Sequence, residues 1–205
     1  MALEKVKPFI KEGISEKELD AKLEYEIRML GAEKSSFDAI IASGYRGALP
    51  HGRASNKIIK NGELITFDFG AIYNGYCSDI TRTLHVGEVT DPKLLEIEAV
   101  LIEAQRLGKL AVKPGVSTFE VDKVCRDYIS EKGYGKYFTH STGHGLGIEV
   151  HEAPGVSFNK SVETILEPGM VITVEPGIYI EGFGGIRIED DILVTENGHE
   201  VLSSI

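Results

Sequence analysis

Four acidic residues stand in apolar, strand-like segments and form two pairs. Asp68 and Asp79 are 79 − 68 = 11 positions apart, and Glu175 and Glu189 are 189 − 175 = 14 positions apart. Unpaired carboxylates are costly to bury, and like charges held close together raise one another's pKa. Arg187, two residues before Glu189, supplies one positive charge. Divalent metal ions would cancel the remaining negative excess, so the acids predict a metal site.

The spacing of each pair predicts a β-hairpin. Asn74-Gly75 is a strong signal for a two-residue type I′ turn. With that turn, Asp68 lies opposite Thr81, and Asp79 lies on the same face of the sheet as Asp68. The Cα atoms of Asp68 and Asp79 would then be roughly 7–8 Å apart. The glutamates bracket a glycine-rich loop over residues 181–185 and share a face only if that loop has an odd length. The alternative is that the acids lie on exposed strand faces, which leaves their matched arrangement unexplained.

A segment rich in histidine and glycine covers residues 140–152 and reads HSTGHGLGIEVHE. Glycines on both sides of His144 allow the backbone there to approach other groups closely. Three histidines in so short a stretch, His140, His144 and His151, favour a functional site over purely structural roles. His51 is a weaker candidate by itself. The spacing matches neither a dinucleotide fingerprint nor the zinc-protease motif with two histidines on one helix.

Three helices are predicted from the signals at their ends. Capping boxes that begin at Ser15 and Ser117 predict helices that stop at Gly31 and Gly133. Asp91-Pro92 predicts the start of a longer helix that runs to about residue 111. The first helix would bury one stripe, formed by Leu19, Leu23, Ile27 and Leu30. Hairpins that alternate with helices indicate an α+β fold.

The sequence also repeats itself weakly. Residues 10–31 align with residues 112–133 at an offset of 112 − 10 = 102, and residues 62–68 align with residues 169–175 at an offset of 107. Shared helix-start rules explain the first alignment equally well. They do not explain the second, which pairs an acid with an acid at the end of an apolar strand. We therefore expect two related halves packed about a pseudo-twofold axis.

Composition limits the classes of function. The chain has 205 residues, of which 42% are hydrophobic and 26% charged, and its formal net charge is −10. Nucleic-acid binding needs clustered Lys and Arg, so we expect no nucleic-acid partner. No apolar run approaches the roughly 20 residues of a membrane helix, and the first residues do not form a secretory signal. Cys77 and Cys125 form no disulfide framework and are expected to be buried, in a cytoplasmic protein.

With these residues described, the sequence resembles the peptidase family that includes methionine aminopeptidases, Xaa-Pro aminopeptidases and prolidases. The likeness covers about residues 8–200. It rests on Asp68-Phe-Gly, Ser78-Asp79-Ile-Thr-Arg82-Thr, Gly143-His144-Gly-Leu-Gly, Val174-Glu175-Pro-Gly and Arg187-Ile-Glu189-Asp. It implies the pita-bread fold, in which two halves related by a pseudo-twofold axis surround a curved antiparallel sheet.

The resemblance implies a metal-binding role for five matched residues. The ligands of two divalent metal ions would be Asp68, Asp79, His144, Glu175 and Glu189. Asp79 and Glu189 would bridge the two ions, and Arg187 would orient a ligand carboxylate. A set of four carboxylates and one imidazole is hard, which favours manganese or cobalt, with zinc or iron also compatible.

The activity implied is that of an exopeptidase that hydrolyses the Xaa-Pro bond at the N-terminus of peptides or in dipeptides. His151-Glu-Ala-Pro, and His140 four residues before His144, resemble the Xaa-Pro branch. His51, His140 and His151 would bind the substrate, and His51 and His151 would also donate to the developing oxyanion. Glu175 would carry a proton to the leaving nitrogen. A methionine aminopeptidase and a non-catalytic interaction domain are the alternatives.

The sequence departs from the Xaa-Pro branch at its N-terminus. Xaa-Pro enzymes usually have a separate N-terminal domain that helps to form the dimer, and we expect this chain to lack it. The expectation is a single metallopeptidase catalytic domain over residues 1–205, with short peptides as its partners and no membrane association. A homodimer, and the preferred length of the peptide, stay open.

Overall fold

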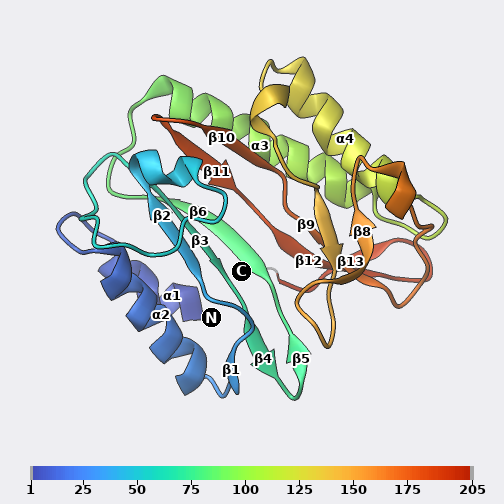
Figure 1. Cartoon of the computed structure of the whole chain (residues 1–205), viewed down its shortest axis with the longest axis horizontal. Helices are drawn as coiled ribbons and strands as arrows, with labels where there is room; N and C mark the ends of the chain where they lie inside the picture. The colour runs from blue at the N-terminus through green and yellow to red at the C-terminus, as the bar shows by residue number, and fades with distance from the viewer. Residues whose placement is uncertain (1, 204–205) are drawn as a thin grey trace.

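The computed structural model describes residues 2–203 and confirms the α+β class. The α-helices are α1 (Ala2–Val6), α2 (Glu16–Met29), α3 (Pro92–Ala111) and α4 (Thr118–Glu131). The last three are the helices predicted from their end signals. In Figure 1, α1 and α2 lie on one side of the antiparallel strands, and α3 and α4 lie on the other side. Within residues 2–203, none of the helices has the combined length and hydropathy of a membrane span.

The strands form four hydrogen-bonded sheets, with the orders β1-β4-β5, β2-β3-β6, β10-β11 and β13-β12-β9-β7-β8. The strands of the first half are β1 (Lys34–Ser35), β2 (Ile40–Ser43), β3 (Leu64–Phe69), β4 (Ala71–Tyr73), β5 (Tyr76–Cys77) and β6 (Ile80–His85). The strands of the second half are β7 (Gly143–Gly145), β8 (Glu152–Val156), β9 (Val171–Val174), β10 (Gly177–Ile180), β11 (Gly184–Arg187), β12 (Asp190–Val194) and β13 (His199–Val201).

The first hairpin has the register that its turn predicts. Asn74 and Gly75 both have positive φ, 50° and 78°, as a type I′ turn requires. Tyr73 pairs with Tyr76 in the strands next to the turn. The same register continues into β3 and β6, where Asp68 pairs with Thr81. A two-residue turn therefore determines which side chains accompany Asp68 on its face of the sheet.

The second hairpin has the odd-length loop that would place its two glutamates together. Residues 181–183 connect β10 to β11. Val174 pairs with Asp190, and the pairing of β10 with β11 continues the same register. Glu175 and Glu189 therefore stand opposite each other, one step along from that pair. The two glutamates share a face of the sheet because the loop between β10 and β11 has an odd number of residues.

The two halves repeat one backbone plan. Ser15 pairs with Ile58, and Ser117 pairs with Ile165, directly before each capped helix. Both capping boxes are complete. In each, the Ser side chain accepts a hydrogen bond from the backbone N–H of the Glu three residues later, and the side chain of that Glu accepts one from the backbone N–H of the Ser. These matched pairs confirm that the alignment of the two halves reflects structure and is not a coincidence of capping rules.

The halves differ at one position of functional interest. Ser43 in β2 and Gly145 in β7 pair with corresponding isoleucines of β3 and β9. One residue earlier in each strand, Ala42 in the first half corresponds to His144 in the second half. The repeated backbone thus carries a methyl group in one half and an imidazole in the other.

Each half has its own apolar core. In the first half, α2 buries Leu19, Leu23 and Ile27 as expected, but Leu30 is 42% exposed. The prediction was wrong for Leu30 because α2 ends at Met29 and the next residue leaves the buried stripe. In the second half, α3 and α4 pack together over the strands around Leu101 and Ile129. The strands between these cores, among them β3, β6, β9 and β12, carry or adjoin the polar side chains described below.

Helices α3 and α4 meet at a glycine. A Cβ atom on Gly108 of α3 would lie 2.4 Å from Sγ of Cys125 in α4, which is closer than van der Waals contact allows. Cys125 is buried, as expected, and burial raises the pKa of its thiol to about 12. Cys77 is only partly buried, and its Sγ lies 3.4 Å from the carbonyl oxygen of Ile148. Gly108 therefore allows a close helix contact.

We expect Gly108→Ala to destabilise the chain by about 1–3 kcal/mol through overpacking. This loss should occur although alanine is favoured over glycine in helices by about 1 kcal/mol. Because the clash involves the sulfur atom, the cost of Gly108→Ala should shrink when Cys125 is replaced by alanine. Urea denaturation of the parent, both single variants and the double variant measures this coupling. The same cost in both backgrounds would show that the helix contact is not what requires glycine.

Candidate metal centre and substrate pocket

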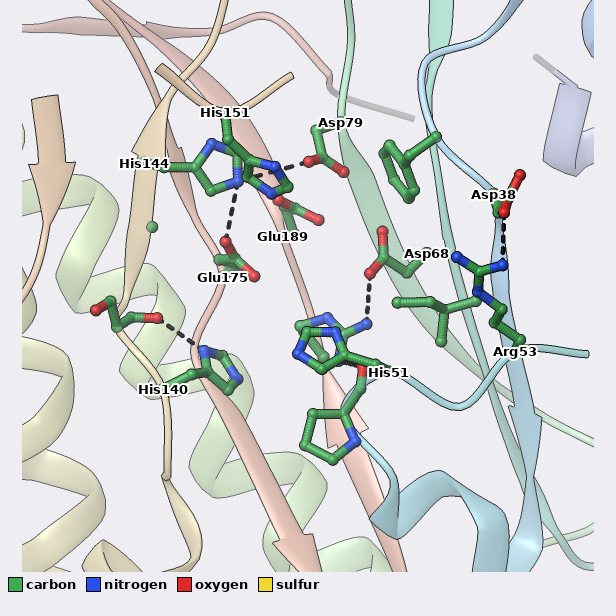
Figure 2. Close-up of a pocket in the computed structure, with 16 residues that line it drawn as sticks. Asp38, His51, Arg53, Asp68, Asp79, His140, His144, His151, Glu175 and Glu189 are labelled. Carbon is green, nitrogen blue, oxygen red and sulfur yellow. Dashed lines mark hydrogen bonds and ion pairs between the residues drawn. The ribbon is translucent and has the colours of Figure 1, made fainter. Parts of the chain in front are cut away.

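All five predicted ligand side chains line one pocket and point toward one another (Figure 2). The structure draws them from both halves, with Asp68 in β3, Asp79 before β6, His144 in β7, Glu175 after β9 and Glu189 before β12. Ligand atoms of Asp68, Asp79 and Glu189 lie within 4.8 Å of one another, as do those of His144, Glu175 and Glu189. Glu189 belongs to both groups.

Three of these carboxylates have an oxygen atom with no partner. Asp68 Oδ1, Asp79 Oδ1 and Glu189 Oε1 are buried and make no hydrogen bond within the described part of the chain. Buried polar atoms in folded proteins almost always have a partner. Oxygen and imidazole donors of this kind are those that divalent ions bind in proteins. The unpartnered oxygen atoms show that these residues fit divalent metal ions.

The electrostatics of the site also call for a cation. Burial, followed by the charges of Asp68 and Glu175, raises the pKa of Asp79 well above its ordinary value. Burial, followed by the charges of Asp79 and Glu175, raises the pKa of Glu189 in the same way. Protons or metal ions are the two ways to neutralise such a cluster. Asp79 and Glu189 are therefore more easily protonated than ordinary carboxylates when no cation compensates them.

His144 and Glu175 form a hydrogen-bonded pair within the cluster. His144 Nε2 lies 3.3 Å from Glu175 Oε1 and 3.6 Å from Asp79 Oδ2. Burial favours a higher pKa for Glu175, but its hydrogen bond to His144 and the charge of that ring outweigh burial and lower the pKa. His144 Nδ1 lies 3.0 Å from the carbonyl oxygen of Gly145. That contact makes Nδ1 the donor and leaves Nε2 directed toward the carboxylates.

Arg187 supplies the positive charge that the sequence pointed to. Its side chain is buried, and Nη2 donates to Oδ2 of Asp68. Nη1 donates to Tyr179 Oη at 2.7 Å and to the carbonyl oxygen of Pro50 at 3.1 Å. The sequence indicated that Arg187 lies near Glu189 along the strand. The structure adds that its ion pair is with Asp68, in the other half.

Tyr179 is a site residue that the sequence analysis missed. Its hydroxyl oxygen lies 2.8 Å from His140 Nε2 and accepts the hydrogen bond from Arg187. Burial raises the pKa of Tyr179 to about 12, so it stays a neutral phenol. Tyr179 is four residues after Glu175, and strand alternation from that glutamate places it on the same face. That alternation was the available signal.

Asp191 is a further buried carboxylate that the sequence analysis missed. Its Oδ2 accepts a hydrogen bond from the backbone N–H of Asp79 at 3.3 Å, and its Oδ1 has no partner in the described structure. Burial raises the pKa of Asp191 to about 7, against the hydrogen bond from Asp79. Asp191 is two residues after Glu189, so the alternation that relates Arg187 to Glu189 places it on the same face.

The three other predicted histidines line the same pocket, which has a volume of about 620 Å³. The rings of His144 and His151 lie 4.3 Å apart, and His151 comes within 4.8 Å of ligand atoms of both His144 and Asp79. Burial lowers the pKa of His140 and of His151 and favours their neutral forms. His140 has a protein partner for each nitrogen, with Nδ1 lying 2.7 Å from the carbonyl oxygen of Ser141. By distance alone, His151 fits a ligand role as well as a substrate-binding role.

Comparison with known sequences finds a protein family and relatives that match nearly the whole of this chain. The model of metallopeptidase family M24 matches residues 1–196. The Xaa-Pro dipeptidase of Pyrococcus horikoshii is 54% identical over 194 residues, which are 95% of this chain and 54% of that protein. The chain therefore spans about half the length of such relatives.

Solved structures agree with the sequence matches. A structure of the Xaa-Pro dipeptidase from Bacillus anthracis has a TM-score of 0.96 and 56% identity, and that of an X-Pro aminopeptidase from Thermotoga maritima has 0.95 and 47%. Each match covers 100% of this chain and 57% of the other. Likeness of this degree confirms the expected pita-bread fold. Together with the family match over nearly its whole length, it shows that this chain belongs to metallopeptidase family M24.

Proposed function

We propose that this chain carries the active site of an exopeptidase that uses two divalent metal ions to hydrolyse the Xaa-Pro bond. The substrates would be peptides with proline in the second position, including dipeptides. The observation that carries the proposal is the convergence of five oxygen and nitrogen donors in one pocket that also holds His51, His140 and His151. Support comes from relatives that are named Xaa-Pro dipeptidase, prolidase and X-Pro aminopeptidase.

The ions would be held by the five converging side chains. These ligands are Asp68, Asp79, His144, Glu175 and Glu189, and their hard donors favour manganese or cobalt. Bound divalent ions would polarise the scissile carbonyl group and lower the pKa of a water molecule toward neutrality. Glu189 belongs to both groups of donors, and Asp79 approaches donors of both halves, so these two suit the bridging positions. Arg187 would hold Asp68 in its orientation through their ion pair.

Glu175 is placed to move the proton in the reaction. Its lowered pKa keeps the carboxylate ionised, which is the form that accepts a proton. As the water oxygen bonds to the carbonyl carbon, Glu175 would take the water proton. It would then deliver that proton to the prolyl nitrogen as the carbon–nitrogen bond breaks.

The histidines would bind the substrate around the reacting bond. His51 and His151 would donate N–H groups to the oxygen atom that becomes negative during attack. Burial lowers the pKa of His151, and its neutral ring carries one N–H for that purpose. His140 already has partners for both ring nitrogens in this structure, so it would contact the substrate through its ring unless it exchanges its bond with Tyr179.

The specificity of the reaction is the direct test of the proposed function. Hydrolysis of an Xaa-Pro dipeptide and an Xaa-Pro tripeptide should exceed hydrolysis of a Met-Ala peptide at matched concentrations, and exhaustive chelation should abolish it. Chromatographic quantification of the products after incubation with manganese, cobalt or chelator provides the measurement. Faster release of methionine would favour the methionine aminopeptidase alternative. Activity that survives chelation would rule out a metal mechanism.

The metal ligands should be separable from the substrate-binding histidines by mutation. Asp79→Asn or Glu189→Gln should abolish metal binding and activity together, because each removes a carboxylate oxygen from the centre. His151→Ala should lower kcat by about 10²-fold with metal content unchanged, as expected for a lost oxyanion donor. Elemental analysis beside steady-state kinetics distinguishes the two classes. Loss of metal from the His151 variant would reassign this residue as a ligand.

Metal binding should release protons. Because burial and neighbouring carboxylates raise the pKa of Asp79 and of Glu189, protons compete with divalent ions for these two groups more strongly than for ordinary carboxylates. The affinity for manganese should therefore rise with pH, by about tenfold per unit for each proton released. Isothermal titration calorimetry in buffers of different ionisation enthalpy counts these protons. Affinity that is constant between pH 6 and pH 8, with no proton release, would contradict the electrostatic account.

A further inference from the structure

Glu16 is a fully buried carboxylate that lies outside the metal centre. It is the first residue of α2, and its side chain has no exposed surface. Oε1 accepts hydrogen bonds from the backbone N–H and the hydroxyl of Ser43, at 2.8 and 2.9 Å. Oε2 accepts three more, from the backbone N–H and hydroxyl of Ser55 and from Arg46 Nη1, at 3.0, 2.7 and 2.9 Å. A buried charge with this many donors is an organised structural element.

The residues that Glu16 binds are the two ends of the loop that carries His51. Ser43 is the last residue of β2, and Ser55 follows the pocket residue Arg53. Arg46, itself paired with Glu16, donates to the carbonyl oxygen of Arg53 at 2.9 and 3.3 Å. One carboxylate therefore sets the distance between the loop ends and removes much of the conformational freedom of the segment between them.

The opposite side of this loop rests on the second half of the molecule. Gly47 and Gly185 of β11 meet so closely that a Cβ atom on Gly185 would lie 2.3 Å from the carbonyl oxygen of Gly47. Arg187 binds the carbonyl oxygen of Pro50 at 3.1 Å. Figure 2 shows His51 projecting from this loop into the pocket, on the side where Asp68 and Glu175 lie. The loop is thus held between Glu16 and the strand that carries Arg187.

The second half holds its own pocket histidine in a similar way. Asp122 of α4 is fully buried and accepts hydrogen bonds from the backbone N–H and hydroxyl of Thr142, both at 2.9 Å. It also pairs with Arg126, which donates to the carbonyl oxygen of His140 at 2.8 Å. In both halves, a carboxylate and arginine pair attached to a capped helix holds the backbone beside a pocket histidine.

We propose that Glu16 is a positioning residue for His51, acting through the loop between Ser43 and Ser55. This proposal rests on the proposed function because hydrolysis of an Xaa-Pro peptide is its main readout. Glu16 is not among the residues that line the pocket, and its side-chain hydrogen bonds within residues 2–203 go to Ser43, Arg46 and Ser55 and not to a predicted ligand. Its effect on turnover is transmitted by the backbone that it fixes, and it requires the imidazole of His51.

A double-mutant cycle between Glu16 and His51 tests the proposal. Glu16→Gln keeps the size of the side chain but removes the charge that Arg46 and the two serines surround. We expect kcat to fall on the order of 10-fold, since a small displacement of a catalytic group has effects of this size. In the His51→Ala background, Glu16→Gln should change kcat by less than about twofold, because the group that it positions is already gone. Equal losses in both backgrounds would overturn the proposal.

Two further measurements separate positioning from loss of stability. Glu120→Gln, which alters the cap of α4, is the control, and its effect should not depend on His51. Hydrogen exchange should accelerate in residues 43–55 for Glu16→Gln and not for Glu120→Gln, with metal content unchanged in both. Arg46→Gln should repeat the pattern if Glu16→Gln proves too unstable to purify. Unchanged exchange in residues 43–55 would contradict the proposed role.

The proposal and the proposed function fail in different ways. A parent chain without Xaa-Pro hydrolysis would contradict the function, while hydrogen exchange would still report whether Glu16 holds the loop. A fully active His51→Ala variant would overturn the role of His51 and, with it, the positioning role of Glu16. Hydrolysis that depends on His51 but shows no coupling to Glu16 would overturn the positioning role alone.

Discussion

The junction of the two halves concentrates negative charge in a place that water reaches poorly. Asp68, Asp79, Glu175 and Glu189 converge from both halves, and Asp191 lies beside them, while Arg187 and His144 are their principal positive or proton-bearing partners. Such a cluster is stable in a folded chain only when cations or protons compensate it. The paired hairpins, the capped helices and the two separate cores can be understood as a frame that holds these carboxylates together in spite of their repulsion.

The part of this arrangement that follows from local rules could be predicted from the sequence. The Asn74-Gly75 turn determines the register that relates Asp68 to Thr81, and an odd loop over residues 181–183 relates the two glutamates. Capping residues predicted three helix starts. These features depend on neighbours close in the chain, for which residue types and alternation carry enough information.

The contacts made across the two halves could not be predicted in the same way. No local pattern tells that Arg187 reaches Asp68 or that Tyr179 joins His140 to Arg187. Glu16 shows the difficulty most clearly, because an acid in the first turn of a helix is ordinarily explained by the helix dipole. Its partners at Ser43 and Ser55 become visible only when the chain is folded. Tyr179 and Asp191 could have been identified as site residues by counting alternate positions along the strands from Glu175 and Glu189.

Ala42 occupies the position in the first half that His144 occupies in the second half, and this makes the two groups of donor side chains chemically unequal. A duplicated backbone would by itself place equivalent donors in both halves, but within residues 2–203 the nitrogen donors grouped with the carboxylates, His144 and His151, both come from the second half. The group of Asp68, Asp79 and Glu189 is all oxygen and carries three formal negative charges, whereas the group of His144, Glu175 and Glu189 carries two. Near-symmetry of the backbone therefore coexists with chemically different groups of donors, so the two ions of the proposed function would meet different ligands and would not need to be the same element.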